Sequence, residues 1–428
     1  MKRFASVAGT VVLGALLPLS AVAETRLFCG DLLDVEAGRM VGASTVVVRD
    51  GEIVSVERGR VEGDGEAVDL SGLFCLPGLM DMHTHLTSES SPTRYVDRFT
   101  ENEADVAFGA LAYARRTLLA GFTTVRDVGD SFNVSLALRD AINRGEVVGP
   151  RMYTSGKSLA TTGGHADPTN GWRADLMGSP GPSDGVLNGV AQAREAVRQR
   201  YKDGSDLVKI TITGGVLSVA KSGLAPQFLP DEVEAVVQTA RDYDMHVAAH
   251  AHGKEGMRRA ILAGIHSIEH GTMMDDEIFA LMAEHGVWFV PTIMAGEFVA
   301  EKAEIDGFYP DLVRPKAREI GPRMQDTFSR AWRAGVPIAF GTDSGVSLHG
   351  DNAREFVLMV ETGMSPAEAI RTATINASKL LGVRDRAGTL EAGNWADVVA
   401  VPVNPLEDIS ALGNVGFVMK AGVIYSQP

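Results

Sequence analysis

Long apolar segments are scarce in this 428-residue sequence, and the clear case lies at its beginning. Lys2 and Arg3 precede an apolar run from Val7 to Leu19, and the small-x-small pattern Ala21-Val22-Ala23 follows it. This order is typical of a secretory signal peptide. A membrane anchor is the alternative, but a spanning helix needs about 20 apolar residues. We expect cleavage after residue 23, a periplasmic or secreted product, and no membrane attachment after cleavage.

Positive charge is also in short supply. The sequence has 40 Lys and Arg against 55 Asp and Glu, and its formal net charge is −15. Such a balance argues against nucleic acid as a partner. Hydrophobic residues make up 45% and charged residues 22%, which is ordinary for a soluble globular protein and excludes long disordered stretches.

Cysteine occurs only twice, as Cys29 and Cys75. Both residues follow the expected cleavage site and would reach an oxidising compartment, where disulfides form. A disulfide and two buried thiols in neighbouring strands are both compatible with the sequence, because sequence does not give the Cα separation that a bridge requires.

The chain length suits a barrel of roughly 250 residues with an accessory domain. Residues 24–77 are β-branched and rich in turns, and Asp50-Gly51 between two such runs predicts a hairpin. Residues 386–428 have the same character. We expect the two chain ends to form one small β-sandwich domain, with residues 78–385 as an α/β TIM (β/α)8 barrel between them.

The barrel is predicted from apolar strand-like runs that alternate with helical patterns, such as residues 103–120 and 190–202. The long segment 158–188 follows the third strand and is expected to be a loop on the catalytic face. The eight predicted strands are residues 78–85, 122–128, 151–156, 206–213, 246–252, 267–271, 287–292 and 337–344.

Histidines and one aspartate stand at the carboxyl ends of these strands, where a TIM barrel displays catalytic groups. His83 and His85 are two residues apart, so both side chains of an extended strand face the same way and can bind one metal ion. Such a pair alone is weak evidence. His250, His270 and Asp343 end three further strands, so the set as a whole indicates a metal site.

Lys209 lies within a predicted buried strand, where an unpaired ammonium is very costly. One explanation is a salt bridge to an inward carboxylate. The other is that burial lowers the pKa of the amine, which then takes up carbon dioxide and becomes a carbamate able to bridge two metal ions.

With their setting, these residues resemble the amidohydrolase superfamily over nearly the whole mature chain. The resemblance is strongest to its imidazolonepropionase-related branch, which contains metal-dependent dipeptidases and N-acyl amino acid hydrolases, including ochratoxin-degrading amidases. The motifs that carry it are residues 76–85, 162–167, 250–253, 267–271, 341–345 and 388–397.

The resemblance implies two divalent metal ions. It places His83, His85 and Asp343 on the first, His250 and His270 on the second, and carboxylated Lys209 on both. Nitrogen and oxygen ligands favour zinc, with manganese, cobalt and iron as alternatives. A metal-bridging hydroxide is the implied nucleophile, and Asp343 the implied proton carrier.

The resemblance also implies that His165 contacts the substrate carbonyl or stabilises the oxyanion. A surface histidine is the alternative for that residue. His252 shares a face with His250 and is expected to touch substrate or to support a ligand. His349 is a weaker candidate, and Asp127 is expected to orient a ligand. We interpret three further histidines as structural: His246, His266 and His285.

We expect a homo-oligomeric hydrolase whose small-molecule substrate is an amide or peptide, cleaved at the bond to a C-terminal amino acid. Hydrolysis of a cyclic amide, as by an imidazolonepropionase, and a non-catalytic binding role are the alternatives. No Arg or Tyr position identifies a binding site for a substrate carboxylate.

Overall fold

The computed structural model describes residues 24–427. The predicted signal peptide, residues 1–23, lies outside that range. Across the described residues, no helix combines the length and the apolar character that crossing a membrane requires.

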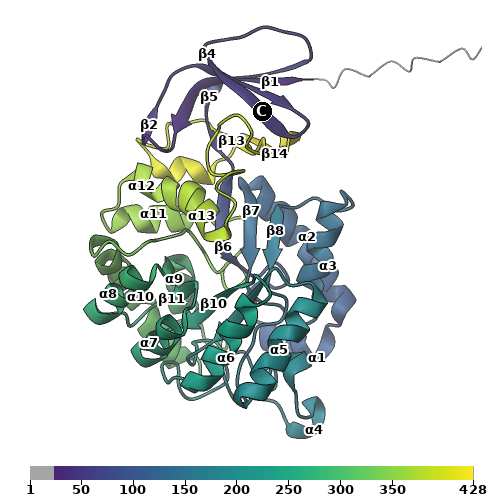
Figure 1. Cartoon of the computed structure of the whole chain (residues 1–428), viewed down its shortest axis with the longest axis vertical. Helices are drawn as coiled ribbons and strands as arrows, with labels where there is room; N and C mark the ends of the chain where they lie inside the picture. Colours follow the sequence, from purple (N-terminus) through teal and green to yellow (C-terminus); the bar gives the residue numbers. More distant parts are fainter. Residues whose placement is uncertain (1–23, 428) are drawn as a thin grey trace, which may run out of the picture.

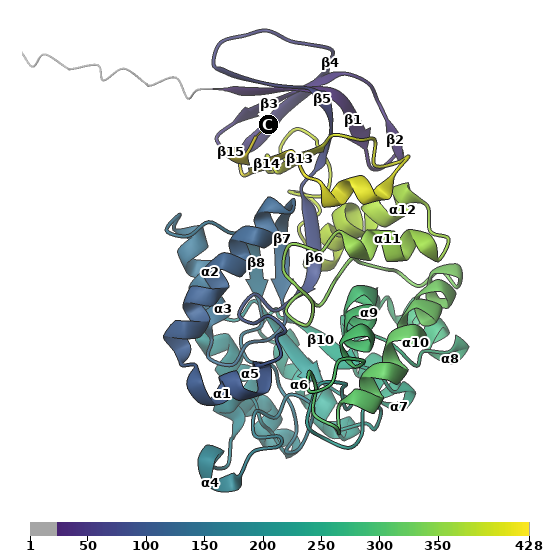
Figure 2. The same cartoon turned by 180° about the vertical axis from the view of Figure 1, so that it is seen from behind.

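Both chain ends contribute to one eight-stranded sheet, drawn at the top of Figures 1 and 2. The Asp50-Gly51 hairpin is confirmed, since β3 and β4 pair antiparallel on either side of it. The strands form one connected sheet, and packing of two sheets as a sandwich stays a prediction. Its strands are β1 (Thr25–Asp34), β2 (Arg39–Met40), β3 (Ser44–Arg49), β4 (Glu52–Arg58), β5 (Glu66–Pro77), β13 (Val398–Val401), β14 (Phe417–Lys420) and β15 (Val423–Ser426).

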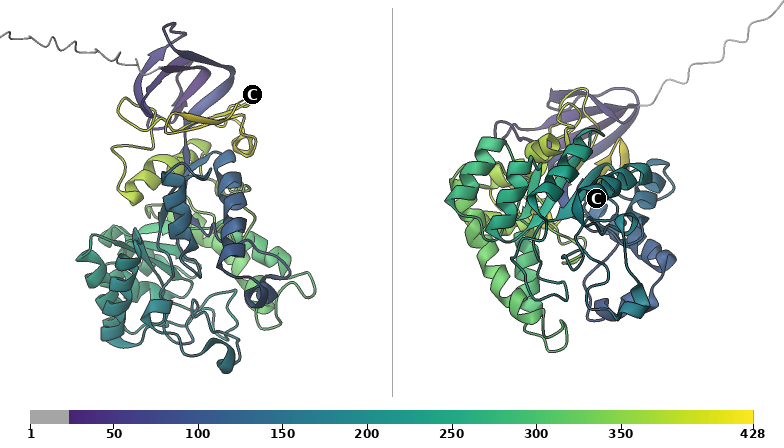
Figure 3. Two further views of the ribbon diagram at one scale, coloured as in Figure 1. Left: turned by 90° about the vertical axis from the view of Figure 1, so that its right-hand side faces the viewer. Right: turned by 60° about the horizontal axis from the view of Figure 1, so that its bottom comes forward.

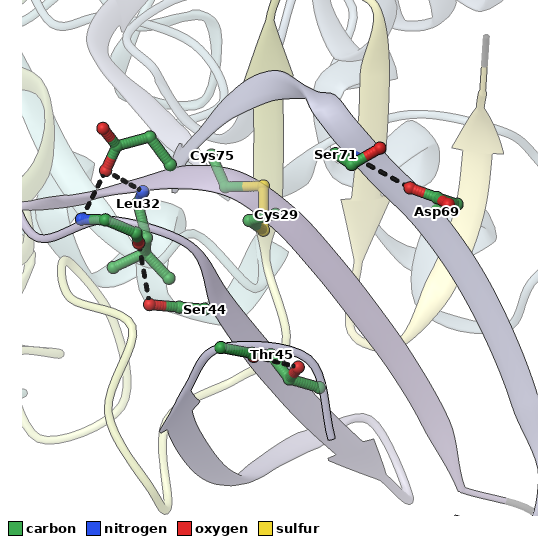
Figure 4. Close-up of a disulfide and its surroundings, with 10 residues drawn as sticks. Cys29, Leu32, Ser44, Thr45, Asp69, Ser71 and Cys75 are labelled. Atoms are coloured by element: carbon green, nitrogen blue, oxygen red, sulfur yellow. Dashed lines mark hydrogen bonds between the residues drawn. A yellow bond between two sulfur atoms is a disulfide. The ribbon is translucent and has the colours of Figure 1, made fainter. Parts of the chain in front are cut away.

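A disulfide joins Cys29 in β1 to Cys75 in β5, as Figure 4 shows. These strands are parallel neighbours, and the two Cα atoms are 5.9 Å apart, within the range that a disulfide needs. Both cysteines are fully buried. The structure therefore selects the disulfide over the pair of free thiols.

The larger part of the chain contains two parallel sheets surrounded by helices, seen from the side and from below in Figure 3. One sheet has the order β6-β7-β8 and the other β12-β11-β10-β9. Parallel strands joined by helices, buried on both faces, are typical of an α/β protein. The strands are β6 (Leu79–Thr84), β7 (Phe122–Asp127), β8 (Arg151–Thr154), β9 (Leu207–Thr211), β10 (His246–Ala251), β11 (Ser267–His270) and β12 (Trp288–Val290).

The helices begin and end where local sequence favours it. The Asn102 side chain accepts a hydrogen bond from the Ala104 amide, and the Asp105 carboxylate accepts one from the Asn102 amide. The helix α2 thus starts with a capping box. Gly204, at φ 92°, ends α5. The helices are α1 (Arg94–Thr100), α2 (Glu103–Leu119), α3 (Val134–Asn143), α4 (Ala174–Met177), α5 (Gly189–Asp203), α6 (Pro230–Arg241), α7 (Lys254–Ala263), α8 (Asp276–His285), α9 (Ile293–Lys302), α10 (Arg314–Arg333), α11 (Arg354–Glu361), α12 (Pro366–Arg371) and α13 (Ala377–Leu381), with short helical turns at Pro182–Asp184, Thr372–Asn376 and Ile409–Gly413.

The eighth predicted strand, residues 337–344, differs from the prediction. Only isolated parallel bridges join it to its neighbours, from Ile338 to Phe289 and from Ser344 to Thr84. The φ of Asp343 is 58°, outside the extended region, so a regular strand cannot run through it. The segment nevertheless lies between β12 and β6, because Phe289 donates to Pro337 and Met82 donates to Phe340.

Candidate metal centre and active site

The six predicted metal ligands come from five places along the chain and gather at the carboxyl ends of the strands. His83 is near the end of β6, Lys209 is within β9, and His250 and His270 lie in β10 and β11. One ligand atom from each of His83, His270 and Asp343 lies within 4.8 Å of the others. His85 joins this group, since its Nε2 is 3.2 Å from Asp343 Oδ1.

A buried ion pair fixes the ring of His83. Its Nδ1 is 2.8 Å from Glu269 Oε2, and Glu269 Oε1 accepts from Arg126 at 2.8 Å. All three side chains are at most 2% exposed. Burial raises the pKa of Glu269, but Arg126 and His83 outweigh it and hold the pKa at about 2. The carboxylate is thus ionised and leaves His83 Nε2 directed away from this pair.

The backbone around β7 holds His85. Its Nδ1 is 2.8 Å from the Gly129 carbonyl, so Nε2 is the nitrogen that faces Asp343. Asp127 accepts from the amide of Leu86 at 2.6 Å and acts on His85 through the backbone. Burial raises the pKa of Asp127 to about 7, while His85 acts in the opposite direction.

The histidines of β10 and β11 rest on neutral partners. His270 Nδ1 is 2.7 Å from Thr292 Oγ1, and His252 Nδ1 is 2.7 Å from Thr272 Oγ1. The ring centroids of His250 and His270 are 4.7 Å apart. Burial, followed by the neighbouring histidines, moves the pKa of both His250 and His270 well below its ordinary value. These rings are therefore neutral at physiological pH, which is the form that binds metal.

Lys209 is 3% exposed, and its positive charge adds to burial in lowering the pKa of histidines in both groups, His83 and His270 among them. Burial lowers its pKa to about 8, although Glu269 and Asp343 act in the opposite direction. Glu269 is already engaged by His83 and Arg126, and Asp343 contacts His85. The inward salt bridge, one of the two explanations for this lysine, is therefore absent from the described ion pairs.

The backbone is strained at three of these positions. His270, Thr292 and Asp343 have φ values of 70°, 52° and 58°. Such values cost side-chain-bearing residues about 1–3 kcal/mol each and concentrate at functional sites. His270 and Asp343 are two of the six predicted ligands, and Thr292 contacts His270, so the strain is stored where the ligands meet.

His165 lies in the long loop after β8 and stacks on His250, with 4.2 Å between ring centroids. A Cβ atom at Gly215 would come within 2.2 Å of the His165 ring, so only glycine fits beneath it. His165 Nδ1 is buried and makes no hydrogen bond to a described residue. Burial lowers the pKa of this ring to about 3. The surface alternative for His165 therefore does not hold.

The donor set fits divalent cations. His83 Nε2 and Asp343 Oδ1 are buried, lie 3.5 Å apart, and make no hydrogen bond of normal geometry to a described residue. Burial raises the pKa of Asp343, but His83, His85 and Lys209 outweigh it and keep the carboxyl ionised. Imidazole nitrogen and carboxylate oxygen are ligands that zinc and related metals prefer.

Comparison with known proteins agrees with this arrangement. The model of the Amidohydrolase family matches residues 74–425. This chain belongs to the amidohydrolase family. It is a hydrolase that acts on carbon–nitrogen bonds, in a family that is generally metal-dependent.

Three relatives show the range of substrates around this amidohydrolase. A crystal structure of a Xaa-Pro dipeptidase with bound methionine is 50% identical, with a TM-score of 0.92 over 94% of this chain and 100% of that chain. Ochratoxinase of Aspergillus niger is 33% identical over 82% of this chain and 76% of that protein. Imidazolonepropionase of Rhizorhabdus wittichii is 26% identical over 89% of this chain and 95% of that protein.

The remaining histidines of this amidohydrolase lie apart from the ligand group. His349 Nε2 is 2.8 Å from the Ser88 carbonyl, and its ring stacks on Tyr113. His246 and His266 stack on each other with 3.9 Å between centroids, and His285 is the last residue of α8.

Glu269 and Arg126 are residues that the sequence interpretation missed. Each is a charged residue inside a buried strand, the same signal that drew attention to Lys209. Applying that argument to every strand would have found both residues. Their pairing could not have been found in this way, because they are 143 residues apart.

Proposed function

We propose that this chain is a secreted binuclear metal-dependent amidohydrolase that releases a C-terminal amino acid from dipeptides, N-acyl amino acids or ochratoxin-type amides. The observation that carries the proposal is the gathering of six ligand side chains at one end of the parallel strands. The two relatives support the substrate class, since one is named for dipeptides and the other for ochratoxin.

His83, His85 and Asp343 would hold the first metal ion, and His250 and His270 the second, with Lys209 between them as a carbamate. Zinc is the metal we expect from these ligands. When bound, two such ions lower the pKa of a shared water and polarise the scissile carbonyl.

The side chains of the protein supply the proton transfer and the orientation. Asp343 is ionised and buried, so it can take a proton and deliver it to the leaving nitrogen. His165 is neutral and therefore carries one N–H group. That group can donate a hydrogen bond to the carbonyl oxygen as negative charge develops there. His252, whose Nδ1 is 2.7 Å from Thr272 Oγ1, would touch the substrate or support a ligand.

A closed TIM barrel is part of the same proposal. On one side, the two sheets meet at a backbone hydrogen bond from the Asp206 amide to the Thr154 carbonyl. On the other side, residues 337–344 bond to both β12 and β6. Eight parallel segments in this order are what a (β/α)8 barrel requires.

Secretion is supported by the signal-peptide pattern and by the Cys29–Cys75 disulfide, which an oxidising compartment favours. Fractionation of expressing cells and N-terminal sequencing test it. A mature chain beginning at Glu24 outside the cytoplasm agrees with the proposal, and an unprocessed cytoplasmic chain contradicts it.

The function is tested by incubating the purified, metal-loaded protein with dipeptides, N-acyl amino acids, ochratoxin A and imidazolonepropionate, with products identified by mass spectrometry. We expect release of a free amino acid, loss of that activity on chelation, and its return with zinc. Ring opening without amino acid release would favour the cyclic-amide alternative. Failure on the whole panel would overturn the proposal. Light scattering on the same preparation tests the expected homo-oligomer.

A further inference from the structure

Ser90, Arg94 and Tyr309 form a second polar group on the catalytic side of the molecule. Ser90 is 7% exposed and Tyr309 is 3% exposed. Within residues 24–427, Ser90 Oγ, Arg94 Nη1 and Tyr309 Oη are buried atoms without a hydrogen-bond partner. A buried polar atom left unpaired costs about 1–3 kcal/mol. Three such donors together indicate a ligand that pairs with them.

The three side chains lie close to one another although Tyr309 is far away in sequence. Burial raises the pKa of Tyr309 to about 12, while a contact with the Ser90 hydroxyl, which falls outside normal hydrogen-bond geometry, and the guanidinium of Arg94 act on it in the opposite direction. The group thus joins the segment that follows β6 to the segment between α9 and α10.

The segment that carries Ser90 and Arg94 starts at the metal ligand His85. The amide of Ser88 donates to the His85 carbonyl at 3.1 Å. Gly345, two residues after Asp343, packs so tightly here that a Cβ atom on it would lie 2.7 Å from His85 Cβ and 3.1 Å from the Ser88 carbonyl oxygen. The path from the ligand group to Ser90 is therefore short and rigid.

Tyr309 is connected to the ligand group through an apolar cluster that also contains Val216, Met273 and Val346. Each of these three residues is tied to the site. The amide of Val346 donates to the Asp343 carbonyl at 2.9 Å, and that of Met273 to the His252 carbonyl at 2.9 Å. Val216 follows Gly215, on which His165 rests.

Two side chains, Tyr95 and Lys316, hold the loop at residues 215–220 in place. Tyr95, next to Arg94 in α1, donates from its hydroxyl to the Leu217 carbonyl at 2.8 Å. Lys316 donates to three carbonyls of the same loop, those of Gly215, Ser218 and Ala220, at 2.9–3.0 Å. The loop that covers His165 is thereby fastened to both α1 and α10.

Arg94 has no ion-pair partner among the described residues, whereas the acidic side chains around it are engaged. Glu89 pairs with Arg116, and Asp97 accepts from Ser91 and Thr93. The guanidinium of Arg94 is thus the uncompensated charge of the group, and an anion is the ligand that it suits.

We propose that Ser90, Arg94 and Tyr309 bind the α-carboxylate of the amino acid that the reaction releases. This inference rests on the proposed function and names the subsite that fixes its substrate class. A guanidinium presents parallel N–H groups that match a planar carboxylate, and two hydroxyls can donate to its remaining lone pairs. A carboxylate bound there would position the scissile bond of the substrate next to Asp343.

The test compares Arg94→Gln and Tyr309→Phe with Arg98→Gln, which removes the same charge from an exposed neighbour on the same helix. Steady-state kinetics are measured on an N-acyl amino acid found in the panel and on its carboxamide. For the acid, we expect KM to rise about tenfold or more in Arg94→Gln and less in Tyr309→Phe, as for a lost charge-assisted hydrogen bond. We expect kcat, the carboxamide kinetics and the Arg98→Gln kinetics to change by about twofold or less.

Binding of L-methionine and L-methioninamide to the metal-loaded proteins, measured by calorimetry, separates this inference from the proposed function. Wild type should bind the acid at least about tenfold more tightly than the amide, and Arg94→Gln should lose that preference. If the substrate panel fails but this preference appears and depends on Arg94, the subsite stands without the proposed function. If amino acids are released but Arg94→Gln and Tyr309→Phe keep the wild-type KM and the wild-type preference, the subsite is wrong. Circular dichroism confirms that each variant is folded.

Discussion

In the proposed metal centre, one histidine of the first half, His83, is held differently from the histidines of the second half. His83 rests on an ionised, fully buried carboxylate, Glu269, which Arg126 neutralises. His250 and His270 rest on neutral groups, a backbone carbonyl and a threonine hydroxyl. Asp343 adds negative charge to the first half, and the second half has no carboxylate ligand among the six. Two divalent cations would therefore have different amounts of negative charge around them.

This difference gives Lys209 its role. Burial is the main cause of the lowered pKa values of His83, His250 and His270, and the positive charge of Lys209 adds to it in all three. Lys209 thus lies between the halves. As an ammonium it would repel two cations, whereas as a carbamate it would supply the anion that the second half lacks. The pKa of about 8 keeps part of the amine neutral, the form that reacts with carbon dioxide.

The largest effect is expected from Lys209→Ala, which removes the charge that the second half depends on. We expect activity to fall by more than about a hundredfold, beyond what loss of a supporting residue gives, and the second metal ion to be lost. Activity and metal content by elemental analysis measure this. Added formate or acetate should restore part of the activity, since a small carboxylate can take the place of the carbamate. Full activity with two bound metals would contradict the charge argument.

Glu269→Gln should weaken the first half. It removes the carboxylate that orients His83 and leaves Arg126 charged and buried. We expect metal affinity at that half to fall towards a hundredfold and the free energy of unfolding to fall by about 3–5 kcal/mol. Metal titration and urea unfolding measure the two effects. If only stability falls, Glu269 supports the fold and does not tune the metal.

Two buried histidines beside the second half, His252 and His165, predict a dependence of stability on pH in the metal-free protein. Burial lowers the pKa of His252 to about 4 and that of His165 to about 3, from 6.5. Between these values and 6.5 the unfolded chain binds more protons at both residues, so the stability that the two neutral rings contribute is full above pH 6.5 and is lost as the pH falls towards 4. The slope is roughly 1.4 kcal/mol per pH unit for each such histidine.

Urea unfolding between pH 7 and pH 4.5 measures this slope. His252→Asn should reduce it, and the same change at exposed His285 should leave it unaltered. An equal slope in wild type and His252→Asn would show that the ring is not held neutral by burial.

The sequence was most informative for site residues whose positions depend on a single strand. The side-chain period of two placed His83 and His85 on one face. The positions of His250 and His270 followed from strand ends, and Lys209 was noticed because it lies inside a buried strand. The salt bridge of Glu269 with Arg126 was missed because it joins different strands, and the Ser90, Arg94 and Tyr309 group because it joins different loops. The prediction of a regular eighth strand was wrong because Asp343 adopts a positive φ, which local sequence preference does not favour.

The smallest effect is expected from Thr292→Val, the counterpart of Glu269→Gln in the second half. Valine keeps the branched shape but cannot accept from or donate to His270 Nδ1, so one neutral hydrogen bond is lost. We expect a loss of about 0.5–1.5 kcal/mol in stability and of about tenfold or less in metal affinity. Thr272→Val, which removes the matching contact of His252, should leave metal content unchanged, because His252 is not one of the six ligands. If Thr292→Val weakened metal binding as much as Glu269→Gln, then the charge of the supporting group would not matter. Geometry alone would then distinguish the two halves.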